Sequence, residues 1–201
     1  MTIVNLEPAT RHMADLVAGV SDDQLDRPTP CPEYSLGDLL DHIGGLALAF
    51  SAAAAKTTDP RAPQRSGLGD ASRLGDDWRT RIPKNLEALA DAWRDPEAWT
   101  GMTHVGEIPL PGELAGVVAL DEVMLHAWDL AQASGQEFEY DPGLLEVIHG
   151  LVQQWSAPGA ESQRDGIFGP VVPVPDDAPL LDRVIGLSGR SPNWAAEIEA
   201  S

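Results

Sequence analysis

The sequence predicts an all-α protein built around a four-helix bundle. Four long segments carry apolar residues at a spacing of three and four, the repeat of a helix with one buried face. These segments are residues 8–20, 35–56, 76–94 and 111–134. No segment shows strong strand-like alternation or a strand–helix–strand rhythm. With 201 residues, the chain can bury a core without disulfides or a structural metal, and we expect a single domain over 1–201.

The first two helices have recognisable starts. Pro8 suits the first turn of a helix over 8–20, where the missing backbone N–H is not needed. Prolines between residues 21 and 33 then predict extended or turning chain. Ser35 resembles a helix N-cap, and Asp38, three residues later, completes an imperfect capping box. The second helix is therefore expected to begin at Ser35.

The middle of the chain alternates a loop with a third helix. Residues 57–74 are rich in Pro, Gly, Ser and Arg, which predicts a long loop. The apolar stripe of 76–94 predicts a helix that Pro83 kinks or restarts. Residues 99–110, which contain two glycines and a proline, predict a short strand or hairpin.

The fourth helix is the longest. It covers 111–134, and Gly135 ends it with a residue suited to a helix C-terminus. Shorter helices are expected over 142–155 and from about 178 to 187. The predicted fold is therefore a bundle with short extra helices near the C-terminus.

Three side chains of two predicted helices form a candidate metal site. Glu122 and His126 are four residues apart and share one face of the fourth helix. His42 lies in the second helix beside small residues that allow close helix packing. One histidine from one helix and a Glu/His pair from another supply three nitrogen and oxygen donors, as a catalytic zinc-type site requires. Asp129, one turn beyond His126, either orients that imidazole from behind or is a solvated charge.

The donor types restrict which metals suit the site, but they do not decide whether a metal binds there. Imidazole and carboxylate suit Zn, Ni or Fe(II), and no thiolate is in the set. A lone Glu-x-x-x-His on a helix is, however, commonly a surface pair or a core histidine, so both interpretations stay open. The set is not the His-Glu-x-x-His pattern of zinc proteases.

Other candidate residues carry weaker signals. His12 is either a further ligand or a core histidine, His104 can reach the mouth of the bundle, and His149 is expected on the surface. Cys31 is the only cysteine, so neither an intrachain disulfide nor a Cys-x-x-Cys zinc site is available. No adjacent basic residue activates its thiol as a nucleophile.

The charge of the chain argues against two kinds of partner. Lys and Arg number 13 and Asp and Glu 32, a net charge of −19, and the half over 101–201 holds only three arginines against 16 acidic residues. Such a protein repels nucleic acid and anionic membrane surfaces. The N-terminal sequence does not resemble a signal peptide, and the longest apolar run, 44–55, is too short to span a bilayer. We therefore expect a cytoplasmic protein.

Three blocks of sequence resemble a known family. They are TPCPEYSLGDLLDHIGG around His42, LDEVMLHAWDLAQASGQ around Glu122 and His126, and a closing segment over 169–194 typical of one actinobacterial subgroup. They are similar to the DinB-like superfamily, in its group of mycothiol-dependent maleylpyruvate isomerase N-terminal-type metal-binding proteins. Tyr34 stands where that family is expected to have Trp.

The resemblance implies a four-helix bundle with a divalent metal near one end. His42 matches the ligand of the family's second helix, and Glu122 and His126 match the pair of its fourth helix. The remaining metal positions would hold water or substrate. Several superfamily members bind a low-molecular-weight thiol, such as mycothiol or bacillithiol, to the metal as a thiolate.

Two classes of function follow from the resemblance. The first is a metal- and mycothiol-dependent transferase or isomerase that joins the thiol to an electrophilic substrate. The second is a non-catalytic metal-binding bundle that senses a ligand or serves in stress. Maleylpyruvate itself is not the expected substrate, because it is anionic and the second half of the chain has so few basic groups. A homodimer is compatible with either class.

Overall fold

A computed structural model describes residues 3–57, 69–160, 164 and 167–199. It divides into two compact units, Met1–Tyr140 and Asp141–Ser201. The expectation of a single domain over 1–201 stays a prediction. Most of the predicted loop 57–74 lies outside the described residues.

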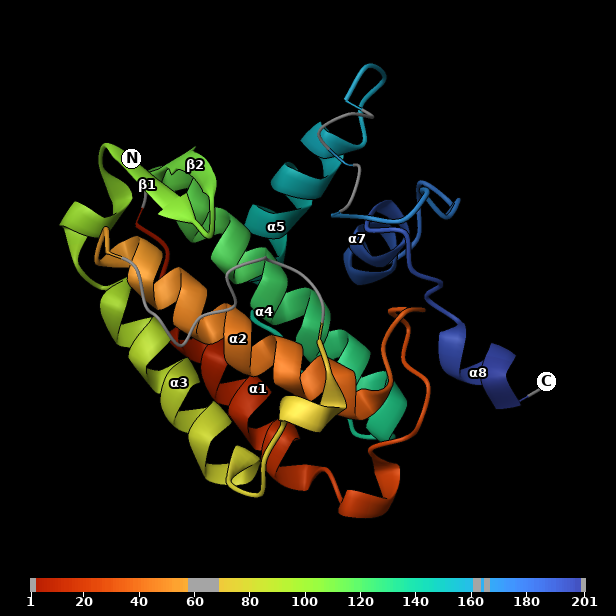
Figure 1. Ribbon diagram of the computed structural model, residues 1–201. Helices are drawn as coiled ribbons and strands as arrows, with labels where there is room; N and C mark the ends of the chain where they lie inside the picture. The colour runs from red at the N-terminus through yellow and green to blue at the C-terminus, as the bar shows by residue number, and fades with distance from the viewer. Residues whose placement is uncertain (1–2, 58–68, 161–163, 165–166, 200–201) are drawn as a thin grey trace. The chain divides into compact units, whose positions relative to one another are not determined.

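The first unit is a bundle of four helices, which confirms the predicted all-α class (Figure 1). Helices α3 and α4 each pack against both α1 and α2. The helices are α1 (Glu7–Gly19), α2 (Leu36–Ala54), α3 (Trp78–Ala92) and α4 (Gly112–Ser134). Apolar residues of all four helices are buried where the helices meet, as the apolar stripes predicted.

The start of α2 is fixed by the predicted capping box. The Ser35 hydroxyl accepts a hydrogen bond from the Asp38 backbone N–H at 3.2 Å, and the Asp38 carboxylate accepts one from the Ser35 N–H at 2.9 Å. Both bonds satisfy backbone groups that the first helical turn leaves without partners. The cap lies two turns before His42, so it sets the register in which that side chain is presented.

The third helix and the hairpin were both predicted from the sequence. Helix α3 contains Pro83 as an interior residue, so the helix does not restart there. Strands β1 (Met102–Val105) and β2 (Ile108–Pro111) form the predicted hairpin, an antiparallel pair. A short 3₁₀ turn, η3 (Pro96–Trp99), precedes the hairpin, and a second one, η2 (Ala71–Arg73), precedes α3.

Two tryptophans close the bundle core against α4. The rings of Trp93 and Trp99 meet edge to face with centroids 5.1 Å apart, and both side chains are buried. The Trp93 indole N–H donates to the Phe50 carbonyl at 3.1 Å, and the Trp99 N–H donates to the Trp93 carbonyl at 2.8 Å. A Cβ atom on Gly116 of α4 would lie 2.5 Å from the Trp99 ring, so the glycine makes room for this pair.

The second unit contains the expected shorter helices. They are α5 (Pro142–Trp155) and α7 (Leu180–Leu187), which pack against each other. A further helix, α8 (Trp194–Glu199), was not predicted. The Arg164 guanidinium is buried and donates to the Ser156 hydroxyl and the Leu187 carbonyl, each at 2.7 Å. It also donates to the Gly169 carbonyl at 2.9 Å, so one cation ties the ends of α5 and α7 together.

Helix α4 is the most enclosed of the bundle helices, because buried residues occur around most of its circumference. Within the described part of the chain, none of the helices is both long and apolar enough to cross a membrane.

Candidate metal centre

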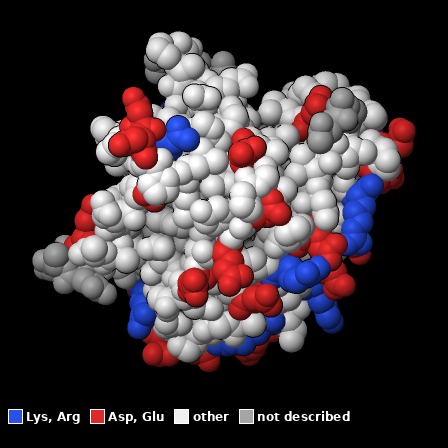
Figure 2. All heavy atoms as spheres, turned by 180° about the vertical axis from the view of Figure 1, so that it is seen from behind, with Lys and Arg blue, Asp and Glu red and all other residues white. Residues whose placement is uncertain are grey.

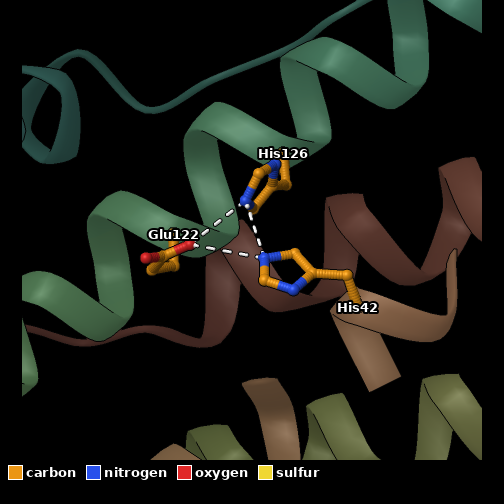
Figure 3. A group of neighbouring side chains, drawn as sticks. All are labelled: His42, Glu122 and His126. Carbon is orange, nitrogen blue, oxygen red and sulfur yellow. Dashed lines mark hydrogen bonds and ion pairs between the residues drawn. The ribbon is translucent and has the colours of Figure 1, made fainter. Parts of the chain in front are cut away.

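The three predicted ligands converge between α2 and α4 (Figure 3). The Nε2 atoms of His42 and His126 lie 3.1 Å apart. Oε2 of Glu122 lies 3.1 Å from the His126 Nε2 and 4.0 Å from the His42 Nε2. All the donor atoms are within 4.8 Å of one another, so packing of α2 on α4 joins residues that are 84 positions apart in the chain.

The donor spacing fits a divalent ion. Bonds of about 2.0–2.2 Å in a tetrahedral arrangement place neighbouring donor atoms about 3.4 Å apart. The measured separations of 3.1, 3.1 and 4.0 Å lie on both sides of this value. Two imidazole nitrogens and a carboxylate oxygen are donors that Zn, Ni and Fe(II) accept.

The three side chains are shielded to different degrees. The exposed fraction is 8% for the His126 side chain, 11% for His42 and 23% for Glu122. The two imidazoles are therefore enclosed by the bundle, while the carboxylate borders solvent. Access to the donor atoms is greatest on the Glu122 side.

Asp129 lies behind His126, as one of the two interpretations of the sequence predicted. Its Oδ2 atom is 2.9 Å from Nδ1 of His126, and its side chain is completely buried. Burial by itself would lower the pKa of His126. Hydrogen bonds to Asp129 and Glu122 outweigh that effect and raise the pKa to about 9. In the metal-free protein, His126 is therefore held as a cation at neutral pH.

Tyr34 belongs to the same cluster, although sequence reasoning noted it only as a departure from Trp. Its ring contacts the His42 ring with centroids 5.2 Å apart and an angle of 47°. Burial raises the pKa of Tyr34. The available signal was its position in the block TPCPEY, eight residues before His42.

The remaining histidines lie elsewhere. His12 is half-buried: its Nε2 accepts a hydrogen bond from the Glu139 backbone N–H at 3.0 Å and its ring packs on Phe138, so it is not a fully buried core histidine. His104 is exposed on β1, and His149 is half-buried on α5 rather than fully on the surface. Among the described residues, the candidate metal group contains none of these three.

Cys31 is half-buried and is not part of the candidate metal group among the described residues. It lies in the turn before α2, where the Thr29 hydroxyl donates to the Cys31 carbonyl at 2.8 Å and to the Tyr34 carbonyl at 2.9 Å. The Tyr34 N–H donates to the Cys31 carbonyl at 3.0 Å. Cys31 therefore lies in a turn whose backbone is fixed by several hydrogen bonds.

An apolar hollow runs into the bundle beside Glu122. It encloses about 240 Å³ of empty space, part of it open to solvent, and its interior leaves room for about one water molecule. Apart from Glu122, its lining is apolar and comes from all four bundle helices: Met13, Ile43, Leu46, Ala47, Phe50, Leu86, Leu89, Ala119 and Val123. The hollow offers an apolar surface next to the most exposed of the three ligands.

Comparisons with known proteins identify the family of the chain. The family described as mycothiol maleylpyruvate isomerase N-terminal domain matches residues 6–131, which include the whole candidate metal group. Two proteins of Mycobacterium tuberculosis, uncharacterized protein MT0763 of strain CDC 1551 / Oshkosh and uncharacterized protein Rv0738 of strain ATCC 25618 / H37Rv, are each 32% identical to the chain over 187 residues. The alignments cover 89% of this chain and 91% of each relative. No solved structure matches the chain significantly. With more than half of its length matched and its donor residues inside the match, the chain belongs to the mycothiol maleylpyruvate isomerase N-terminal domain family.

Proposed function

We propose that the chain binds a divalent metal ion through His42, Glu122 and His126, and that it uses mycothiol in a transferase or isomerase reaction. One observation carries the proposal: two helices bring three donor atoms within 4.8 Å of one another. The family name supports the choice of thiol. Zinc is the first candidate ion, and nickel and iron suit the same donors.

The residues around the site have separable tasks. A bound divalent ion supplies the positive charge that favours the thiolate form of a thiol at neutral pH. The Nε2 atoms of His42 and His126 and a carboxylate oxygen of Glu122 would hold that ion. Asp129 accepts the Nδ1 hydrogen of His126, which leaves the Nε2 lone pair of the neutral ring directed at the ion.

The surroundings also restrict the second substrate. The hollow beside Glu122 is lined by apolar side chains, so a substrate group that borders its opening is favoured when it is apolar rather than charged. The chain carries a net charge of −19, and acidic side chains are scattered over the face shown in Figure 2. A neutral, mostly apolar electrophile is therefore favoured over an anionic one such as maleylpyruvate.

Metal analysis and a conjugation assay test the proposal. Purified protein should hold about one divalent ion per chain, and the metal-loaded protein should conjugate mycothiol to members of a panel of neutral electrophiles. His126→Ala should lose both ion and turnover, whereas Cys31→Ala should keep both, because the nucleophilic sulfur belongs to mycothiol. Loss of turnover in Cys31→Ala but not in His126→Ala would contradict the mechanism.

A second candidate function is a metal-binding bundle without catalysis, which senses a ligand or serves in stress. The small interior of the hollow beside Glu122 favours it, because a space with room for about one water molecule holds no large substrate. Full metal loading without turnover, with mycothiol and every electrophile of the panel, would select this alternative.

A further inference from the structure

We infer that Tyr34 is a positioning residue of the metal centre, whose ring holds the His42 imidazole in the orientation that directs Nε2 at Glu122 and His126. The inference rests on the proposed metal site and adds a residue that the three-ligand description does not include. Tyr34 reaches the site from the turn before α2, whereas the ligands come from α2 and α4.

The two imidazoles have different kinds of neighbour beside them. His126 has the buried Asp129 carboxylate at 2.9 Å from its Nδ1 atom. His42 has the Tyr34 ring against it, with centroids 5.2 Å apart and the planes tilted by 47°. A ring on one side limits rotation about the bond that joins the imidazole to Cβ, and that rotation decides where Nε2 points. The 3.1 Å separation of the two Nε2 atoms depends on this angle.

The position of Tyr34 is itself fixed by backbone hydrogen bonds and by burial of its ring. Its carbonyl accepts from the Thr29 hydroxyl at 2.9 Å, and its N–H donates to the Cys31 carbonyl at 3.0 Å. Pro28 and Ser35 form an isolated antiparallel bridge across the same turn. The exposed fraction of Tyr34 is 8%, so its ring is enclosed as well as tethered.

The chain at Gly69 contacts both Tyr34 and the helix that carries His42. The Gly69 backbone hydrogen-bonds the Tyr34 hydroxyl. A Cβ atom on Gly69 would lie 2.0 Å from the Asp38 carbonyl oxygen and 3.2 Å from the Cβ atom of His42. The chain at Gly69 therefore lies directly on α2 beside His42, at a distance that only glycine allows.

The residues after Gly69 are bound to α2 by hydrogen bonds and an ion pair. The Ala71 N–H donates to the Asp38 carboxylate at 2.7 Å, and the Asp70 N–H donates to the Asp41 carboxylate at 3.1 Å. The Arg73 guanidinium lies 2.7 Å from the same Asp41 carboxylate. The partner of the Tyr34 hydroxyl is thus anchored to the helix that carries His42.

Ring and hydroxyl can be tested separately. Tyr34→Phe keeps the ring and removes only the bond to Gly69, and Tyr34→Trp restores the residue expected for the family. Tyr34→Leu removes the ring, and Tyr34→Met fills the space with a flexible side chain if the Leu variant folds poorly. Phe138→Leu is the matched control, because it removes a ring that packs on a histidine outside the site, His12, at 5.5 Å.

The measurement is Co²⁺ binding, read as affinity by chelator competition and as the visible absorption spectrum of the bound ion. We expect Tyr34→Leu and Tyr34→Met to bind Co²⁺ about 10-fold more weakly than wild type and with an altered spectrum, as for groups that orient metal ligands. Tyr34→Phe, Tyr34→Trp and Phe138→Leu should keep the wild-type spectrum. Folding is checked by circular dichroism.

Two outcomes overturn the inference in different ways. Wild-type affinity and spectrum in the folded Leu or Met variant would show that the ring does not position His42, while the metal site itself stands. Absence of Co²⁺ binding in wild type, or equal binding by wild type and His42→Ala, would remove the proposed metal site and the inference together.

Discussion

Nδ1 of His126 lies 2.9 Å from Oδ2 of Asp129, a carboxylate that is completely removed from solvent. Both residues belong to α4, three positions apart, so one turn of a single helix carries a candidate ligand and the carboxylate that contacts it from behind. The contact directs the opposite nitrogen of the ring at His42 and Glu122. Orientation of a ligating histidine by a buried acceptor is a frequent feature of metal sites.

Replacing Asp129 by Asn should weaken metal binding while leaving the ligands in place. The amide can still accept a hydrogen bond from Nδ1, but it lacks the negative charge that makes the imidazole a stronger donor to the metal. We expect Zn²⁺ affinity to fall about 10-fold or more in a competition titration. Glu113→Gln is the matched control, because it neutralises an exposed carboxylate on the same helix. Equal affinity in both variants would show that Asp129 does not support the site.

Removing any one ligand should release the ion without unfolding the bundle. His42→Ala, Glu122→Ala and His126→Ala leave the apolar contacts among the four helices largely intact. Circular dichroism should therefore show wild-type helix content, while metal analysis shows loss of the ion. Added Zn²⁺ should raise the melting temperature of wild type only, because an ion that binds the folded state stabilises it by mass action. A zinc-dependent rise in all three variants would place the ion elsewhere.

The stability of the metal-free protein should fall at alkaline pH. The pKa of His126 is raised to about 9 from an ordinary value of 6.5, so folding favours its protonated form. This contribution is fully present below pH 6.5 and is lost as the pH rises through about 9. Thermal unfolding after chelation should show a decline between these values that is smaller in His126→Gln. An equal decline in both proteins would assign the alkaline loss to other groups.

Local signals account for the parts of the fold that the sequence predicted well. Apolar spacing located the four bundle helices, because each presents apolar residues at a spacing of three and four to its neighbours. The cap formed by Ser35 and Asp38 depends on residues three positions apart, and it was predicted for that reason. Two of the three candidate ligands are local in the same sense, since Glu122 and His126 share one helix face.

The other features of the site depend on contacts between residues that are far apart in the sequence or lie in a turn. His42 meets His126 only because α2 packs on α4; small residues beside His42 suggested that packing, and the family resemblance supported it. Tyr34 was missed because a turn, which has no repeat, folds it onto His42. The partner of His12 is the backbone of Glu139, 127 positions away, and no pattern in the first helix could have identified it.

Gly116→Ala should destabilise the bundle although alanine is the better helix former. Alanine gains about 1 kcal/mol of helix propensity over glycine. The added Cβ atom, however, would lie 2.5 Å from the Trp99 ring and 2.8 Å from the Trp93 ring. Overpacking of this kind costs about 1–3 kcal/mol, because buried neighbours must leave their preferred positions. The two indoles have little room to move, since each is buried and hydrogen-bonded through its N–H.

The control for this prediction is Gly150→Ala in α5, where a Cβ atom would meet nothing within 4 Å. That variant gains helix propensity without a clash, so its melting temperature should equal or exceed that of wild type. For Gly116→Ala, a net loss of about 1 kcal/mol corresponds to a decrease of roughly 2–4 °C in melting temperature. Circular dichroism and tryptophan fluorescence should report it together, because the strained contact involves the two indoles themselves. If Gly116→Ala were instead as stable as Gly150→Ala, the tryptophan pair would have to shift freely, and α4 would not be held at this point by close packing.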